Sequence, residues 1–96
     1  MDSTPEERYK DIEFRFSNRF DRSYNRLDYQ DQEKVDEALE LFRNNPEHPS
    51  LELEKIRGKE DIWSIRATRA IRITFNWEEN TVALRVVGDH RVYSNP

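Results

Sequence analysis

The sequence predicts an α+β fold in which a twisted, mostly antiparallel sheet carries an N-terminal helical hairpin on one face. Apolar and polar residues alternate near the start and over the last third of the chain, as they do in half-buried strands. Between these segments, apolar residues recur at spacings of three and four, as on amphipathic helices. The expected order of elements is therefore β-α-α-β-β-β.

The chain begins with an acidic segment and then enters its first strand. We expect residues 1–9 to be a flexible lead and residues 10–96 to form one domain. From residue 10 to residue 16 polar and apolar side chains alternate, which predicts a strand with one buried side. The side chains predicted to be buried are Ile12, Phe14 and Phe16.

Two helices follow, close enough in sequence to pack as an antiparallel hairpin. Ser17 is a favourable N-cap for the first helix, and Asp28 is a favourable N-cap for the second, which ends near Asn44 ahead of Pro46. The apolar stripe of the first helix is Phe16, Phe20, Tyr24 and Leu27, and that of the second is Val35, Ala38, Leu39 and Phe42. A basic stripe on the first helix consists of Arg15, Arg19, Arg22 and Arg26. Ion pairing with the acidic second helix is the simplest role for that stripe.

Three strands close the predicted domain, after residues 51–56, which are either a short strand or an extended connector. The last strand is rich in β-branched residues and apolar on both faces, which predicts a central place in the sheet. The three strands are expected at residues 62–67, 71–77 and 81–87.

The composition favours a folded protein outside the membrane and argues, as a total, against a nucleic-acid partner. The 96 residues carry a formal net charge of −4, have no cysteine, and are 11% aromatic. The chain lacks both an apolar run of ~20 residues that could span a bilayer and a secretory signal, so we expect a cytoplasmic protein. With two histidines and no thiol, no metal site is expected.

The charge is unevenly distributed along the chain. Residues 1–60 hold 11 Lys and Arg against 16 Asp and Glu, whereas residues 61–96 hold 5 Arg against 4 acidic residues. Residues 64–77 contain Arg66, Arg69 and Arg72 and no acidic residue. The net charge of −4 therefore averages over two different surfaces, and it does not exclude RNA as a binding partner.

The alternation in the last strands places Arg66 and Arg72 on one face of the sheet, away from the helices. Two guanidinium groups on neighbouring strands would form a fork for phosphate oxygens, although a solvated sheet face explains the same pattern. Near the end of the chain, His90 can titrate near neutral pH, and Tyr93 can transfer a proton or stack on a base.

Three segments in this order resemble the RelE/ParE superfamily of toxin–antitoxin toxins, and most closely its RelE-like mRNA interferases. Residues 16–58 resemble the helical hairpin and its exit, with an Asn-Pro stop and a Leu-rich lead to Arg-Gly. The segment IWSIRATRAIRITF resembles the aromatic-x-Ile-Arg…Arg-Ile strand pair. The segment VALRVVGDHRVYSNP resembles the closing strand and its histidine- and tyrosine-containing end.

The resemblance implies the toxin of a bacterial type II toxin–antitoxin system. Such a toxin is a ribosome-dependent endoribonuclease that cleaves mRNA by attack of the 2′-hydroxyl, with no metal or other cofactor. The implied partners are a cognate antitoxin, the ribosome and mRNA, with no membrane involved. By position, Arg66 and Arg72 would hold the scissile phosphate, His90 would act as acid or base, and Tyr93 would stack on a base or assist proton transfer. Further RNA-binding candidates are Lys55, Arg57, Arg69, Arg85 and Arg91.

Two alternatives stay open at the level of the sequence. A ParE-like toxin would keep the fold and inhibit DNA gyrase, with little need for a histidine and tyrosine pair. A non-catalytic interaction module would use the basic stripe of the first helix to bind an acidic partner or ribosomal RNA.

Overall fold

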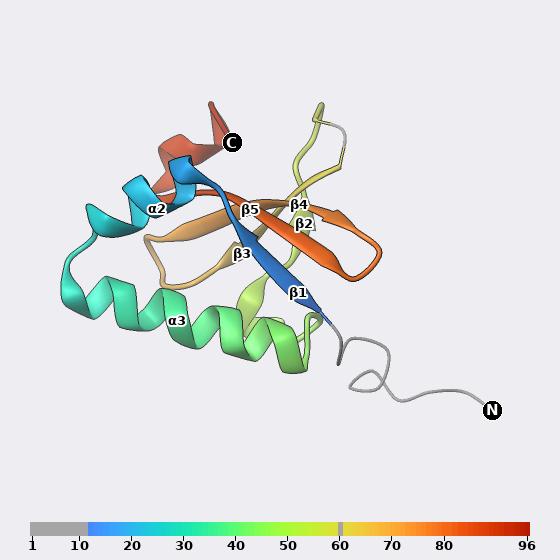
Figure 1. The fold of residues 1–96 in the computed structure, drawn as a ribbon, viewed down its shortest axis with the longest axis horizontal. Helices are drawn as coiled ribbons and strands as arrows, with labels where there is room; N and C mark the ends of the chain where they lie inside the picture. Colours follow the sequence, from blue (N-terminus) through green and yellow to red (C-terminus); the bar gives the residue numbers. More distant parts are fainter. Residues whose placement is uncertain (1–11, 60) are drawn as a thin grey trace.

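One sheet of five strands forms the frame of the molecule in the computed structural model, which describes residues 12–59 and 61–96 (Figure 1). The strands are β1 (Glu13–Phe16), β2 (Glu54–Lys55), β3 (Ile62–Arg66), β4 (Arg72–Glu78) and β5 (Thr81–Gly88). They lie in the order β1-β5-β4-β3-β2, with β1 parallel to β5 and the other pairs antiparallel. The predicted fold class and the central place of the last strand are confirmed, whereas the predicted lead at residues 1–9 lies outside the described residues.

The two predicted helices are present as α2 (Asn18–Asn25) and α3 (Tyr29–Asn44). The Ser17 hydroxyl accepts a hydrogen bond from the Phe20 N–H at 3.0 Å, and the Asp28 carboxylate accepts one from the Asp31 N–H at 2.8 Å. Both predicted N-caps are thus formed. The described residues also include two 3₁₀ turns, η1 (Pro49–Leu51) and η2 (His90–Tyr93). Within the described residues, no helix has the length and apolar character needed to cross a membrane.

The main core lies between α3 and one face of the sheet, and Phe42 stands at its centre. Its ring lies 5.3 Å from the ring of Phe75 and 5.2 Å from that of Trp77, both in edge-on arrangements. The other buried members of this core include Val35, Ala38, Ile65, Ile73, Val82 and Leu84. The predicted stripe of the second helix and the predicted apolar side of the later strands therefore meet, as expected.

Helix α2 continues the edge of the sheet where β1 ends. The Ser17 hydroxyl donates to the Arg85 carbonyl at 3.2 Å, and the Ser23 hydroxyl accepts from the Val87 N–H at 3.1 Å. The first helix thus satisfies backbone groups of β5 that the short β1 does not reach. Phe16 lies at this junction and is 54% exposed, so its predicted burial is wrong. The strand ends at Phe16, and the centre of the Phe16 ring lies 5.7 Å from that of the Phe20 ring.

The opposite face of the sheet is partly covered by the C-terminal turn η2, which lies on the other side of the sheet from α3 in Figure 1. Ser64 and Thr74 on this face are 1% and 0% exposed, and Val92 of η2 is also buried. Gly88 permits the close approach, because a Cβ at this position would lie 3.2 Å from the Val92 side chain. The central part of this face is therefore a second, smaller packed layer rather than a solvated surface.

The basic stripe on the first helix does not pair with α3. Arg15 pairs with Glu13 at 3.8 Å, and Arg19 donates to the carbonyl oxygens of Asn95 and Pro96. Over residues 12–59 and 61–96, no ion pair joins the stripe to the acidic helix. The expected pairing across the hairpin is therefore wrong, and Arg19 turns toward the C-terminal tail instead.

We predict that Phe42→Ala lowers the free energy of unfolding by about 3–5 kcal/mol, because it removes the ring that joins α3 to the sheet. Tyr29→Ala is the matched control, since Tyr29 is 73% exposed, and it should change that free energy by no more than about 0.5 kcal/mol. Urea unfolding followed by circular dichroism measures both. Equal effects of the two substitutions would contradict this description of the core.

Candidate functional site

A pocket of about 190 Å³ opens where the turn between β3 and β4 meets η2. Three of the four predicted catalytic side chains line it, together with one predicted RNA-binding arginine. The full lining is Arg69, Ala70, Arg72, Asp89, His90 and Tyr93. Residues separated by about 20 positions in the sequence are thus brought to one end of the sheet by the hairpin and the C-terminal turn.

The turn that begins this site is built around Thr68. Its hydroxyl accepts hydrogen bonds from the Ala70 N–H at 3.2 Å and from the Ile71 N–H at 3.1 Å. A Ser or Thr hydroxyl that bonds its own backbone in this way stabilises a tight turn. The turn sets the register of the hairpin, in which Arg66 lies directly opposite Arg72.

Arg72 is held firmly by backbone carbonyl groups of the same turn. Its Nη1 donates to the carbonyl oxygen of Thr68 at 2.8 Å and to those of Arg69 and Ile71 at 3.3 Å. Its side chain is only 21% exposed. The guanidinium is therefore fixed before any ligand arrives.

Arg66 and Arg72 share a carboxylate that the sequence pattern did not reveal. Glu52 Oε1 lies 3.3 Å from Arg66 Nη1, and Glu52 Oε2 lies 3.7 Å from Arg72 Nη2. Register explains the contact: Glu54 pairs with Ser64, so Glu52 falls in the row of Arg66. The two-residue strand β2 gives no periodic signal, so only the pairing of β2 with β3 could have identified Glu52.

The two C-terminal candidates differ in their surroundings. His90 is exposed, and its imidazole has no hydrogen-bond or ion-pair partner among the residues that the structure describes. Tyr93 is half-buried, and its hydroxyl lies 3.5 Å from the Ser64 hydroxyl. Tyr93 is thus anchored on the sheet, whereas His90 is free to meet a ligand at the mouth of the pocket.

Asp89 begins η2 and binds Arg91. Its carboxylate accepts from the Arg91 N–H at 3.0 Å and forms a two-pronged contact with the Arg91 guanidinium, with Nη2 at 2.8 Å from Oδ2. The side-chain hydrogen bonds from Arg91, followed by the backbone N–H of the same residue, lower the pKa of Asp89 from 3.8 to about 2. Asp89 is therefore ionised at neutral pH, and it holds the turn that presents His90 and Tyr93.

The other predicted RNA-binding residues lie outside the pocket. Lys55 is the last residue of β2 and Arg57 lies in the loop that follows it, at the far end of β3 from Arg66. Arg85 is the extra residue of a bulge, because Thr74 and Phe75 of β4 pair with Val86 and Leu84. Its guanidinium binds the Asn76 side chain at 2.6 Å and the Pro96 carbonyl at 3.3 Å. The structure places these three apart from the arginine pair, and their RNA-binding role stays a prediction.

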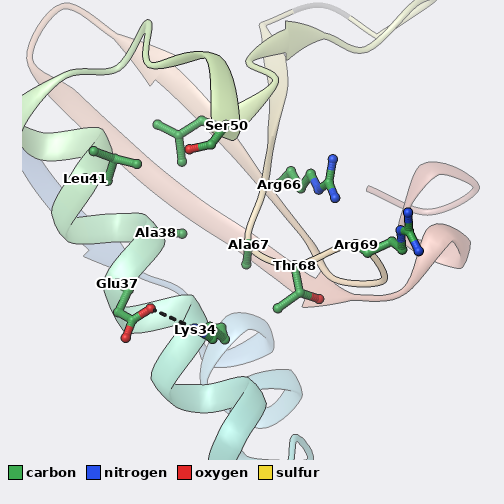
Figure 2. Close-up of a pocket in the computed structure, with 10 residues that line it drawn as sticks. Lys34, Glu37, Ala38, Leu41, Ser50, Arg66, Ala67, Thr68 and Arg69 are labelled. Atoms are coloured by element: carbon green, nitrogen blue, oxygen red, sulfur yellow. Dashed lines mark hydrogen bonds and ion pairs between the residues drawn. The ribbon is translucent and has the colours of Figure 1, made fainter.

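A larger groove of about 420 Å³ lies beside the pocket, between α3 and the β3–β4 turn. In Figure 2, Ala38 and Leu41 of α3 lie across from Ala67 of the turn, while Arg66 and Arg69 extend on the side away from α3. The two charged residues of α3 that line this groove already pair with each other, since Lys34 Nζ lies 3.4 Å from Glu37 Oε2. Arg69 borders both hollows, so a ligand in the pocket would reach the edge of this groove.

Taken together, the site combines fixed positive charge with groups that can move protons. Arg69 has no ion pair within the described part of the chain, and Arg72 is preorganised by carbonyl groups. Fixed cations of this kind stabilise negative charge that develops on a phosphate during reaction. An imidazole and a phenol beside them can accept or donate protons.

The lowered pKa of Asp89 gives a test of the C-terminal turn. Because the folded pKa lies below its ordinary value, the Asp89 contacts contribute to stability above pH 3.8 and are lost as the pH falls toward 2. We expect Arg91→Ala to return the pKa of Asp89 toward 3.8, since it removes the largest cause of the shift. An NMR titration of the carboxyl carbon measures the pKa of Asp89 in the wild type and in Arg91→Ala. Identical midpoints in the two proteins would contradict the contact between Asp89 and Arg91.

Comparison with solved structures identifies the fold. No family model and no curated protein matches the sequence significantly. YafQ from E. coli strain BL21(DE3) superimposes with a TM-score of 0.72 at 10% identity, covering 84% of this chain and 96% of that one. The YoeB dimer from Staphylococcus aureus superimposes with a TM-score of 0.67 at 19% identity, covering 82% of this chain and 97% of that one. The RelB–RelE complex from Methanococcus jannaschii contains a chain that superimposes with a TM-score of 0.64 at 18% identity, covering 84% of this chain and 95% of that one. The chain therefore has the fold of the RelE, YafQ and YoeB toxins, and the predicted resemblance is confirmed at the level of the fold.

Proposed function

We propose that this protein is the toxin of a type II toxin–antitoxin pair and cleaves mRNA on the ribosome. The observation that carries the proposal is the convergence of Arg69, Arg72, His90 and Tyr93 on one pocket, with Arg66 paired in register beside Arg72. These are the residue types that phosphodiester cleavage by an internal 2′-hydroxyl requires, and they occur on a fold shared with toxins.

In the proposed reaction the ribose 2′-oxygen attacks the adjacent phosphorus. A bond forms between the 2′-oxygen and phosphorus, and the bond from phosphorus to the 5′-oxygen of the next nucleotide breaks. The 2′-hydroxyl loses a proton and the departing 5′-oxygen gains one, so the products are a cyclic phosphate and a 5′-hydroxyl end. His90 supplies or accepts one of these protons, and Tyr93 stacks on a base or assists the transfer.

The arginines act on the phosphate itself. Negative charge increases on the phosphoryl oxygens as the fifth bond to phosphorus forms, and Arg66 and Arg72 lie in one row across two strands to meet it. Arg72 needs no reorganisation, because three carbonyl oxygens already hold its Nη1. Preorganised donors of this kind make a large contribution to catalysis in many enzymes.

The proposed protein partner is a cognate antitoxin. The similar structures include complexes of YafQ with DinJ and of RelE with RelB that are described as toxin and antitoxin pairs. The same pairing, carried to this chain, predicts that co-expression of a short neighbouring gene product would neutralise it. The ribosome and translated mRNA complete the set of proposed partners.

The proposal is tested by inducing the wild-type protein in a bacterial host and mapping mRNA 5′ ends. We expect growth arrest with new ends inside translated messages. Arg72→Ala should reduce cleavage by roughly 10²–10³-fold, as the loss of a preorganised donor does, and His90→Ala by roughly 10²–10⁴-fold. Arg22→Ala is the control, because Arg22 is exposed on α2 and belongs to no described ion pair or hydrogen bond as a side chain.

Three other outcomes are informative. Absence of both growth arrest and cleavage, while a known toxin acts in parallel, would overturn the proposal. Growth arrest with intact mRNA and an induced DNA-damage response would indicate gyrase as the target. Growth arrest that persists in Arg72→Ala and His90→Ala but is lost in Arg22→Ala would favour the non-catalytic interaction module.

A further inference from the structure

The carboxylate of Glu52 is placed between the two arginines that the proposed function assigns to the phosphate. Each of its two oxygens faces a different guanidinium, at 3.3 Å from Arg66 and at 3.7 Å from Arg72. A phosphodiester would present its two non-bridging oxygens to the same pair. The acidic side chain therefore occupies the place where the negative charge of a substrate would be received.

The backbone holds Glu52 in an uncommon conformation. Its φ of 46° and ψ of 48° lie in the left-handed region, which is unfavourable for a residue with a side chain. Its N–H donates to the Pro49 carbonyl at 3.2 Å and closes the 3₁₀ turn η1. Leu51, the preceding residue, is fully buried and anchors this turn. The position of Glu52 is thus set by packed structure on its N-terminal side.

The ion pairs that Glu52 makes are weak enough to be replaced. The Glu52 side chain is 54% exposed, and the Arg66 side chain is 34% exposed. Ion pairs that face solvent contribute little to stability, because water screens them and the side chains lose freedom. A phosphate that is held by other contacts as well can displace the carboxylate, whereas a free anion has to compete with it.

We propose that Glu52 is an internal competing ligand, which occupies the phosphate position of the arginine pair until a positioned RNA strand displaces it. This inference rests on the proposed function, because it assigns the same arginines to an RNA phosphate. Removal of the carboxylate should strengthen binding of a phosphodiester to the isolated protein.

Glu54 provides a matched control for the substitution. It is the same residue type, two positions along, and it pairs with Ser64 rather than with Arg66. It has no ion pair with any residue that the structure describes. Glu52→Gln and Glu54→Gln change the net charge equally, so a difference between them reports the local effect alone.

The probe is a fluorescent 2′-O-methyl tetranucleotide, which carries phosphodiesters and cannot be cleaved by 2′-oxygen attack. Fluorescence anisotropy measures its affinity for the wild type and each variant at one salt concentration. We expect Glu52→Gln to bind roughly three- to tenfold more tightly than the wild type, which lies within the range for the loss of two exposed ion pairs, and Glu54→Gln to bind within about twofold. Adding Arg72→Ala to Glu52→Gln should abolish the gain.

Several outcomes would overturn the inference. Equal gains in the two glutamine variants would indicate net charge alone, and weaker binding by Glu52→Gln would mean that the carboxylate orients the arginines for the ligand. Absence of binding by every variant would mean that the arginine pair receives no phosphodiester. If Glu52→Gln unfolds, Glu52→Gly replaces it, because glycine adopts the left-handed conformation without strain.

This binding measurement is separate from the test of the proposed function. It uses the isolated protein, no ribosome and an uncleavable ligand, so a defect in catalysis leaves it unaffected. Failure of growth arrest in cells would overturn the nuclease and leave the competing-ligand result in place. A failed binding result together with active cleavage would overturn only the role given to Glu52.

Discussion

The register between β3 and β4 is the constraint on which the candidate site depends. It places Arg66 opposite Arg72 and Ser64 opposite Thr74 on one face, while Ile65 and Ile73 meet in the core on the other. A slip of one residue would send the arginines into the core and the isoleucines into water, so burial of the apolar face fixes the cationic row. The Thr68 turn reinforces this register by closing the hairpin through two side-chain hydrogen bonds.

The second requirement is that η2 stays docked on the far face of the sheet. Val92 is buried against Gly88, and the capping carboxylate of Asp89 holds the first turn through Arg91. The same short turn exposes His90 and anchors Tyr93 next to Ser64. The small apolar contact between Val92 and Gly88 therefore brings His90 and Tyr93 to the same pocket as Arg72, which belongs to the β3–β4 hairpin.

Charge is organised by layer in this protein, which accounts for an acidic chain that carries a cationic pocket. Helix α3 covers one face of the sheet and holds much of the acid, in Asp31, Glu33, Asp36, Glu37 and Glu40. Arg66 and Arg72 belong to the opposite face, where Glu52 is the acidic residue in ion-pair contact with them among the described residues. The net charge of −4 is thus compatible with a local site for phosphate, because electrostatic attraction at contact distance is set by neighbouring groups.

The sequence by itself determined the α+β class, both helix N-caps and the faces of the later strands. These features follow from local periodicity and capping, which need no knowledge of distant contacts. It also indicated Arg66, Arg72, His90 and Tyr93 as one candidate group, through spacing and resemblance. Tertiary structure alone decided that Phe16 is exposed, that Arg19 turns to the C-terminal tail, and that Glu52 lies between the arginines. Each of these depends on which segments lie side by side at a sheet edge, and a two-residue strand or a strand end carries too little pattern to specify that.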